Sequence, residues 1–154
     1  MSHTIPAPST THDLQAPQGL VRGESAAPPI AQLIGFTLVQ VELGGSVAEL
    51  EAGPQHANPM GTLHGGIICD VADLAMGTAM ATTLEDEESF TTLDSSVKFL
   101  KPVWNGSLCA TATVLKRGAV LGLIECEVRD NEERPAAKMY STCMVRGGEA
   151  ARGR

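Results

Sequence analysis

Aromatic residues are scarce in this chain of 154 residues: Phe, Trp and Tyr together make up 3%, although apolar residues make up 43%. The core must therefore be built from Val, Leu, Ile, Ala and Met, which suits a helix packed closely on a sheet. Basic residues are also few, 11 against 18 acidic ones, so the net charge is −7. This balance argues against non-specific nucleic-acid binding, which needs a basic surface. An anionic ligand would have to be met by a local group of cations.

The cysteines form no C-x-x-C pair, because Cys69, Cys109, Cys126 and Cys143 are widely spaced. Zinc-site spacing is absent, and a disulfide framework is unusual in a chain with so large an apolar fraction. The N-terminus shows no basic-then-apolar signal pattern. We therefore expect reduced thiols in a cytoplasmic protein that is not embedded in a membrane.

The length predicts one domain. Residues 1–27 are rich in Pro, Ala, Ser and Thr without an apolar period, and 147–154 look equally unstructured, so we expect a disordered arm and tail around a folded domain at 28–146. A short helix is expected over 30–34. Strands are expected in six segments separated by Gly, Pro or Asn: 36–43, 46–51, 90–100, 107–116, 120–129 and 135–145. With a long helix after residue 66, this predicts an α+β domain whose antiparallel sheet wraps around one central helix.

The segment 67–83 is almost free of charge, since Asp70 and Asp73 are its only acidic or basic residues. At about 100° per residue, one broad helix face should lie on the sheet. This face carries Ile67, Ile68, Val71, Leu74, Ala75, Thr78 and Ala79. The opposite face carries Cys69, Asp73, Met76 and Met80, with Gly77 at its edge. Because it too is apolar apart from Asp73, we expect a second subunit to cover it; an exposed Met-rich face is the alternative.

An unpaired carboxylate in such a helix has a large desolvation cost, which is typical of a functional site; an ordinary polar residue at an interface rim, or a hydrogen-bonded structural acid, is the alternative. Periodicity favours Asp73, with Asp70, about 60° away around the helix, as an alternative. Gly65 and Gly66 precede the helix, where unpaired N–H groups polarise a carbonyl oxygen and glycine permits close approach, as in an oxyanion hole. The pair is also consistent with a simple tight turn. The preceding His64 is compatible with a structural role.

Polar residues gather at the strand expected over 90–100. Strict alternation places Thr92, Asp94 and Ser96 on one face and Leu93, Ser95 and Val97 on the other. Four cations, Lys98, Lys101, Lys116 and Arg117, lie within a short span, and they suit either a phosphate-bearing ligand or solvated strand ends.

Two motifs carry a resemblance to a known family. The pattern N-x-x-G-x-x-H-G-G at 58–66, an aspartate nine residues after the histidine, and T-x-D-x-x-V-x-F-L-x-P at 92–102 resemble the hotdog-fold thioesterases, specifically the phenylacetic-acid-degradation (PaaI-like) branch. The similarity covers residues 29–145. It implies a hotdog fold, hydrolysis of a small or aromatic acyl-CoA, and a homodimer, often paired into a homotetramer, with active sites at the subunit interface.

The resemblance also implies residue roles. Asp73 corresponds to the catalytic base or nucleophile, and Gly65 to the backbone donor on the thioester carbonyl. Asn58 and His64 would orient the substrate and assist the leaving thiolate. Thr92 would position water, and it would come, like Asp73, from the subunit opposite to the glycine.

The substrate-binding positions implied by the resemblance are Phe99, Lys116, Arg117 and Gly118, which would grip the coenzyme A nucleotide. The family often has a basic residue next, where this chain has Ala119, so the expected grip is weaker. No metal or redox cofactor is implied, since coenzyme A is part of the substrate. Two other functions are alternatives: a non-catalytic acyl-CoA-binding or sensing module, and a dehydratase, against which the positions of His64 and Asp73 argue.

Overall fold

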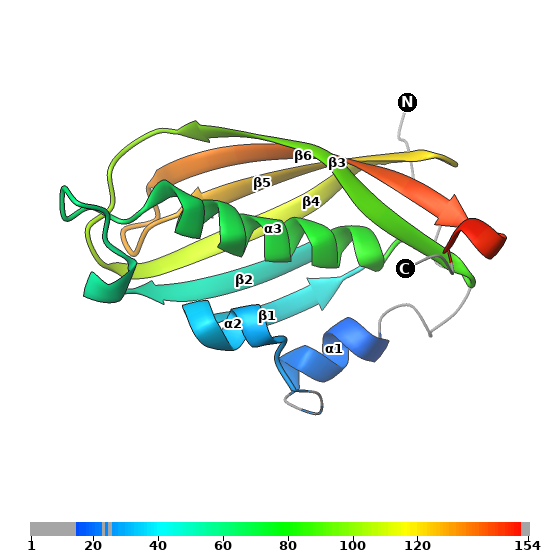
Figure 1. Ribbon diagram of the computed structural model, residues 1–154, viewed down its shortest axis with the longest axis horizontal. Helices are drawn as coiled ribbons and strands as arrows, with labels where there is room; N and C mark the ends of the chain where they lie inside the picture. The colour runs from blue at the N-terminus through cyan, green and yellow to red at the C-terminus, as the bar shows by residue number, and fades with distance from the viewer. Residues whose placement is uncertain (1–14, 23, 25, 152–154) are drawn as a thin grey trace.

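The computed structural model describes residues 15–22, 24 and 26–151. Six strands form one antiparallel sheet in the order β1-β2-β4-β5-β6-β3, and the long helix α3 lies along its inner face (Figure 1). The strands are β1 (Phe36–Glu42), β2 (Gly45–Ala52), β3 (Glu88–Phe99), β4 (Gly106–Arg117), β5 (Leu121–Arg129) and β6 (Pro135–Gly147). The helices are α1 (Gln15–Val21), α2 (Pro29–Ile34) and α3 (Gly65–Ala81), with short 3-10 turns η1 (Pro54–His56) and η2 (Gly148–Ala151). The predicted hotdog arrangement is confirmed.

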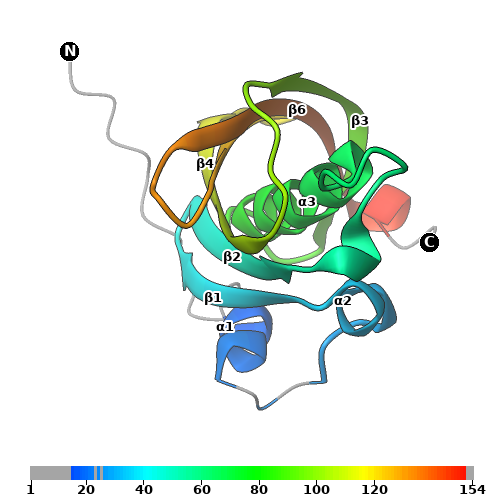
Figure 2. The same ribbon diagram turned by 90° about the vertical axis from the view of Figure 1, so that its left-hand side faces the viewer.

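Seen end on, the sheet curls around α3 (Figure 2). Small residues make this close packing possible, because Ala72, Ala75 and Ala79 on the helix are fully buried, as are Ala48 and Ala110 on β2 and β4. The sheet therefore surrounds the helix with little space between the backbones. This matches the scarcity of aromatic residues.

The curl also corrects the expected helix faces. Met76 and Met80 are buried in the core rather than placed on the open face. Room for Met80 comes from β5, where a Cβ on Gly122 would lie 2.6 Å from the Met80 sulfur. A sheet that wraps a helix covers a wider arc than a flat one, so the open stripe of α3 is narrow and includes Asp70, Asp73 and Gly77.

Strand β3 is at the end of the strand order and pairs only with β6 among the described strands. A register shift lies between Thr92 and Asp94, and this bulge corrects the predicted alternation. Thr92 pairs with Cys143 and Ser95 with Ser141, both buried residues of β6. Directly paired residues point to the same side of a sheet, so Thr92 and Ser95 share the helix-facing side. Asp94 does not.

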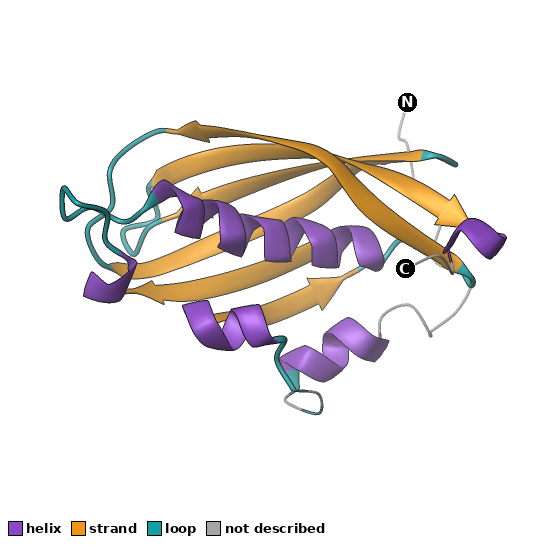
Figure 3. Ribbon diagram, in the orientation of Figure 1, coloured by secondary structure: helices purple, strands orange, loops and turns teal. Residues whose placement is uncertain are grey.

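Two helices lie outside the sheet. Figure 3 shows α1 and α2 beside β1, on the side away from α3. Helix α2 ends at Gly35, whose φ of 93° is the left-handed conformation that glycine adopts readily. Regular structure at α1 and η2 falls within the segments 1–27 and 147–154 for which none was predicted; residues 1–14 and 152–154 lie outside the described residues.

All four cysteines are free. Within the part of the chain that the structure describes, no helix is both long and apolar enough to cross a membrane.

Candidate active site

The start of α3 presents one free backbone donor. His64 caps the helix, and its Nδ1 accepts a hydrogen bond from the Gly66 N–H at 2.9 Å. The Ile67 N–H donates to the His64 carbonyl at 3.0 Å. Among the described residues the Gly65 N–H has no partner. This N–H lies at the positive end of the α3 dipole, so it can polarise a carbonyl oxygen that binds there.

The ring of Phe99 packs against Gly65 on the side where a Cβ would stand. A Cβ on Gly65 would lie 2.8 Å from Phe99 Cζ, so only glycine permits this approach of the ring. The ring itself is 53% exposed. Phe99 and Gly65, predicted separately from two motifs, are thus brought together in one subunit.

Asn58 holds the loop that precedes the helix. Its side-chain amide donates to Thr62 Oγ1 at 2.8 Å, and its Oδ1 accepts from the Met60 N–H at 2.9 Å. These bonds account for Asn58 as a loop-forming residue. A contact between Asn58 and substrate stays a prediction.

His64 has a defined tautomer in this arrangement. Because Nδ1 accepts from Gly66, the proton of the neutral ring is on Nε2. The ring is exposed. His64 therefore offers an Nε2–H donor close to the start of α3.

Asp73 lies on the open stripe of α3 and is exposed in the single chain, on the face that we expect a second subunit to cover. Partial desolvation nevertheless raises its pKa above the usual value of 3.8, and the neighbouring charge of Asp70 raises it further. In the described part of the chain neither aspartate has a Lys or Arg partner. A raised pKa is the direction of shift expected for a carboxylate that acts as a general base.

Thr92 lies near Asp73 in the same subunit. Thr92 Oγ1 is 3.8 Å from the sulfur of Cys143, and the Asp73 charge contributes to the raised pKa of that thiol, after burial. Cys69, one helical turn before Asp73, also has its pKa raised by burial and then by Asp70 and Asp73. Both thiols are therefore protonated at neutral pH, which disfavours a cysteine nucleophile. The position of Cys69 one helical turn before Asp73 follows from the sequence. The position of Cys143 beside Thr92 depends on the pairing of β3 with β6.

One subunit does not unite all of these groups. Eight residues separate Gly65 from Asp73, which at 1.5 Å per residue is about 12 Å along the helix axis. The attacking oxygen must lie about 3 Å from the carbonyl carbon. The oxyanion donor must at the same time lie within hydrogen-bond distance of the oxygen bonded to that carbon. Gly65 and Asp73 of one chain cannot act on the same carbonyl.

The predicted nucleotide grip lies at the opposite end of α3 from Phe99. Val114 on β4 donates to Gly44, whose own N–H donates to Thr82 just after the helix. Arg117, at the end of β4, is ion-paired with Glu88 and donates to the Gly118 carbonyl. Lys116 is exposed. Within one subunit the structure therefore separates the turn at 116–118 from Phe99.

The four cations do not form one cluster either. Lys98 and Lys101 lie at the Phe99 end of β3, Lys98 within the strand and Lys101 just after it, and Lys101 is ion-paired with Asp130. Lys116 and Arg117 belong to the other end. The proximity expected from the sequence was wrong within a subunit, since the two pairs lie on strands that run to opposite ends of the sheet.

A sheet curled around one helix is the hotdog arrangement, and among the described residues this helix begins with an N–H that has no partner and carries an aspartate without a cationic partner two turns on. The family described as the Thioesterase superfamily matches residues 60–137, half of the chain. The chain belongs to this superfamily and is an enzyme of the thioester hydrolase class.

Individual relatives agree with this. The chain is 29% identical over 105 residues to a 1,4-dihydroxy-2-naphthoyl-CoA hydrolase of Listeria monocytogenes, covering 68% of this chain and 85% of that one. It is 26% identical over 116 residues to acyl-coenzyme A thioesterase 13 of Homo sapiens, covering 74% and 82%. The PaaI protein of E. coli has the same fold, with a TM-score of 0.77 over 91% of this chain and 98% of that one, at 21% identity.

Proposed function

We propose that this protein hydrolyses a small or aromatic acyl-CoA to the free acid and coenzyme A. The observation that carries the proposal is the Gly65 N–H, which has no partner among the described residues and belongs to a residue that the Phe99 ring contacts. A backbone donor at a helix start stabilises the oxyanion that forms when a thioester carbonyl is attacked. Relatives whose names specify an aromatic CoA ester and an acyl-CoA support the choice of substrate.

In the proposed reaction the carbonyl oxygen accepts a hydrogen bond from the Gly65 N–H. Asp73 removes a proton from water, which Thr92 positions, and the resulting hydroxide adds to the carbonyl carbon. The tetrahedral intermediate then collapses, the C–S bond breaks, and coenzyme A leaves as a thiolate that the His64 Nε2–H and Asn58 assist. Direct attack by the Asp73 carboxylate, followed by hydrolysis of the anhydride, gives the same products. No metal or redox cofactor is required, because a thiolate is a good leaving group.

The distance of about 12 Å between Gly65 and Asp73 along the helix leads us to propose a composite site. Strand β3 has an unpaired edge among the described strands, and residues 92–96 along it are exposed. Antiparallel pairing of two such edges about a two-fold axis runs the two α3 helices in opposite directions. Gly65 of one chain then approaches Asp73 and Thr92 of the other. We propose a homodimer on this basis, with pairing into a homotetramer as a further step.

The same two-fold arrangement bears on nucleotide binding. It carries the turn at 116–118 of one chain toward the Phe99 end of the other. Lys116 is exposed and has no ion-pair partner among the described residues, so it is free to meet a phosphate. Arg117 would have to exchange Glu88 for phosphate before it could bind the nucleotide. We therefore assign the first phosphate contact to Lys116, with Arg117 and Gly118 shaping the turn.

The assay is thiol release from a panel of acyl-CoAs. Asp73→Asn is nearly isosteric and should lower kcat at least about 100-fold, since general-base catalysis typically contributes that much. Asp70→Asn is the matched control on the same stripe of the helix and should retain activity. Loss of activity in Asp70→Asn alone would move the base to Asp70. Tight binding of CoA esters without turnover by the wild type would indicate a sensing module instead.

Mixing tests the composite site directly. Asp73→Asn and Gly65→Pro, each inactive alone, are unfolded or dissociated together and reassembled in equal amounts. Random reassembly gives one subunit of each variant to half of the dimers. Each of these mixed dimers has one intact site out of two, so the sample should recover about one quarter of wild-type activity. No recovery above the two parents, with mixed dimers present by mass, would show that each site lies within one chain.

A further inference from the structure

The segment from Phe99 to Val103 crosses the start of α3 as a strap. At its first residue the Phe99 ring packs on Gly65. At its last, the Val103 carbonyl accepts a hydrogen bond from the Leu63 N–H at 2.7 Å. Leu63 immediately precedes the helix cap. Both ends of the strap thus contact the backbone that presents the Gly65 N–H.

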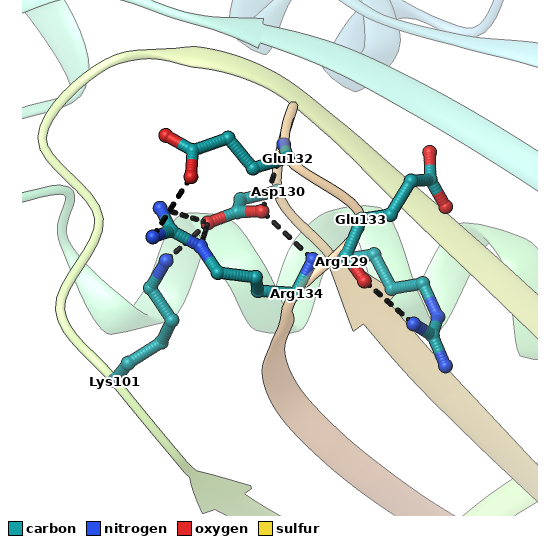
Figure 4. A network of polar contacts seen from close by, with 6 residues as sticks. All are labelled: Lys101, Arg129, Asp130, Glu132, Glu133 and Arg134. Carbon is teal, nitrogen blue, oxygen red and sulfur yellow. Dashed lines mark hydrogen bonds and ion pairs between the residues drawn. The ribbon is translucent and has the colours of Figure 1, made fainter.

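Between these two contacts the strap is fastened to the turn that joins β5 and β6. The Lys101 ammonium donates to Asp130 Oδ2 (Figure 4). The Leu100 N–H also donates to the Ala136 carbonyl at 2.9 Å. Asp130 is only 5% exposed, so its bond to Lys101 is largely shielded from water.

Asp130 is rigidly held on its own side. Its Oδ1 accepts from the Glu132 and Arg134 N–H groups, each at 2.9 Å. Its Oδ2 accepts from Arg134 Nε at 3.1 Å in addition to Lys101. These donors hold the pKa of Asp130 well below its usual range, and the hydrogen bond from Lys101 has the largest effect. The carboxylate is consequently charged at every pH at which the enzyme would be assayed.

We propose that Asp130 and Lys101 are positioning residues for the reaction: they clamp the strap and so fix where Phe99 and Gly65 meet the thioester. The inference rests on the proposed function. Neither residue needs to touch the substrate. A displacement of about 1 Å in a group that orients a substrate can cost up to about 100-fold in rate, so a clamp two residues from Phe99 has a direct effect on turnover.

The test compares two partners of the same carboxylate. Lys101→Met keeps the aliphatic stem but releases the strap, whereas Arg134→Met removes a partner that lies within the Asp130 turn itself. Asp130 keeps two backbone donors and one cation in either variant, so both should fold. We expect Lys101→Met to lower kcat about tenfold or more, and Arg134→Met to lower the melting temperature with kcat unchanged. Lys101→Arg, which keeps the charge, should retain activity.

A second measurement is independent of turnover. Amide hydrogen exchange at Leu63 reports the bond to Val103, and it should be faster in Lys101→Met but not in Arg134→Met. If the wild type hydrolyses no thioester, the proposed function fails, while exchange at Leu63 still tests the clamp. Unchanged Leu63 exchange in Lys101→Met would overturn the clamp. Faster exchange with unchanged kcat, or equal loss of kcat in both variants in proportion to their stability, would overturn the positioning role.

Discussion

Gly65→Pro tests the oxyanion donor by removing the Gly65 N–H. Proline lacks the N–H but is favoured at the first position of a helix, which Gly65 occupies. The residue before a proline must be extended, and His64 already has φ −64° and ψ 128°. The backbone therefore accommodates proline at position 65 without rearrangement.

Proline also adds a Cβ, which would lie 2.8 Å from Phe99 Cζ. Gly65→Ala is the control for this added Cβ, because it adds the same atom and keeps the N–H, whereas proline also puts its Cδ in the place of the N–H hydrogen. The ring is 53% exposed and is free to swing outward, so neither variant should unfold the protein. Replacing glycine by alanine in a helix contributes up to about 1 kcal/mol of stability, which offsets the displacement of the ring, and proline is well tolerated at the first helical position.

The expected difference between the two variants is the value of one oxyanion donor. Loss of such a donor typically lowers kcat by about 10²–10³, or about 2.7–4 kcal/mol in the transition state. Thiol release should therefore show Gly65→Pro at least about 100-fold below Gly65→Ala in kcat, with melting temperatures of both variants measured alongside. Equal kcat in the two variants would refute the assignment of the Gly65 N–H.

Three further predictions concern charge and packing. Because the pKa of Asp73 is raised above 3.8 by partial desolvation and by Asp70, kcat/KM should fall as pH drops through that raised value. Asp73→Asn should also stabilise the fold at neutral pH and lose this advantage in acid, since ionising an acid with a raised folded pKa destabilises the folded state; an advantage independent of pH would contradict this cause. Lys116→Ala should raise KM for CoA esters but not for thioesters without a nucleotide, and equal KM effects on both substrates would remove its phosphate role. Arg117→Ala should lower stability by about 1–3 kcal/mol, because it leaves the Glu88 carboxylate without its cation. Gly122→Ala places a Cβ 2.6 Å from the Met80 sulfur and should destabilise by about 1–3 kcal/mol in a urea titration, and an unchanged midpoint would show that Met80 has room to move.

Local sequence signals predicted most of the elements. Glycine and proline punctuation located each strand within about two residues, as such signals usually allow. The bulge after Thr92 was not predictable, because alternation of residue types does not reveal an extra residue in one strand of a pair. Nor were the buried positions of Met76 and Met80, which depend on how far the sheet curls.

The motif at 58–66 singles out Gly65 and His64 by residue type and spacing, because a helix start and its cap are local in sequence. The partners of those residues are not local. Phe99 contacts Gly65 across the fold, and Cys143 lies beside Thr92 through strand pairing. Arg117, which the sequence suggested as a phosphate ligand, is ion-paired with Glu88.

The sequence by itself thus determined the class of fold and the family, since both depend on local periodicity and a contiguous motif. Tertiary structure decided which groups meet. It brought Phe99 onto Gly65, left the edge of β3 unpaired among the described strands, and fastened the strap at Lys101 to Asp130. Such contacts follow from sheet order and curvature, which no short stretch of residues encodes.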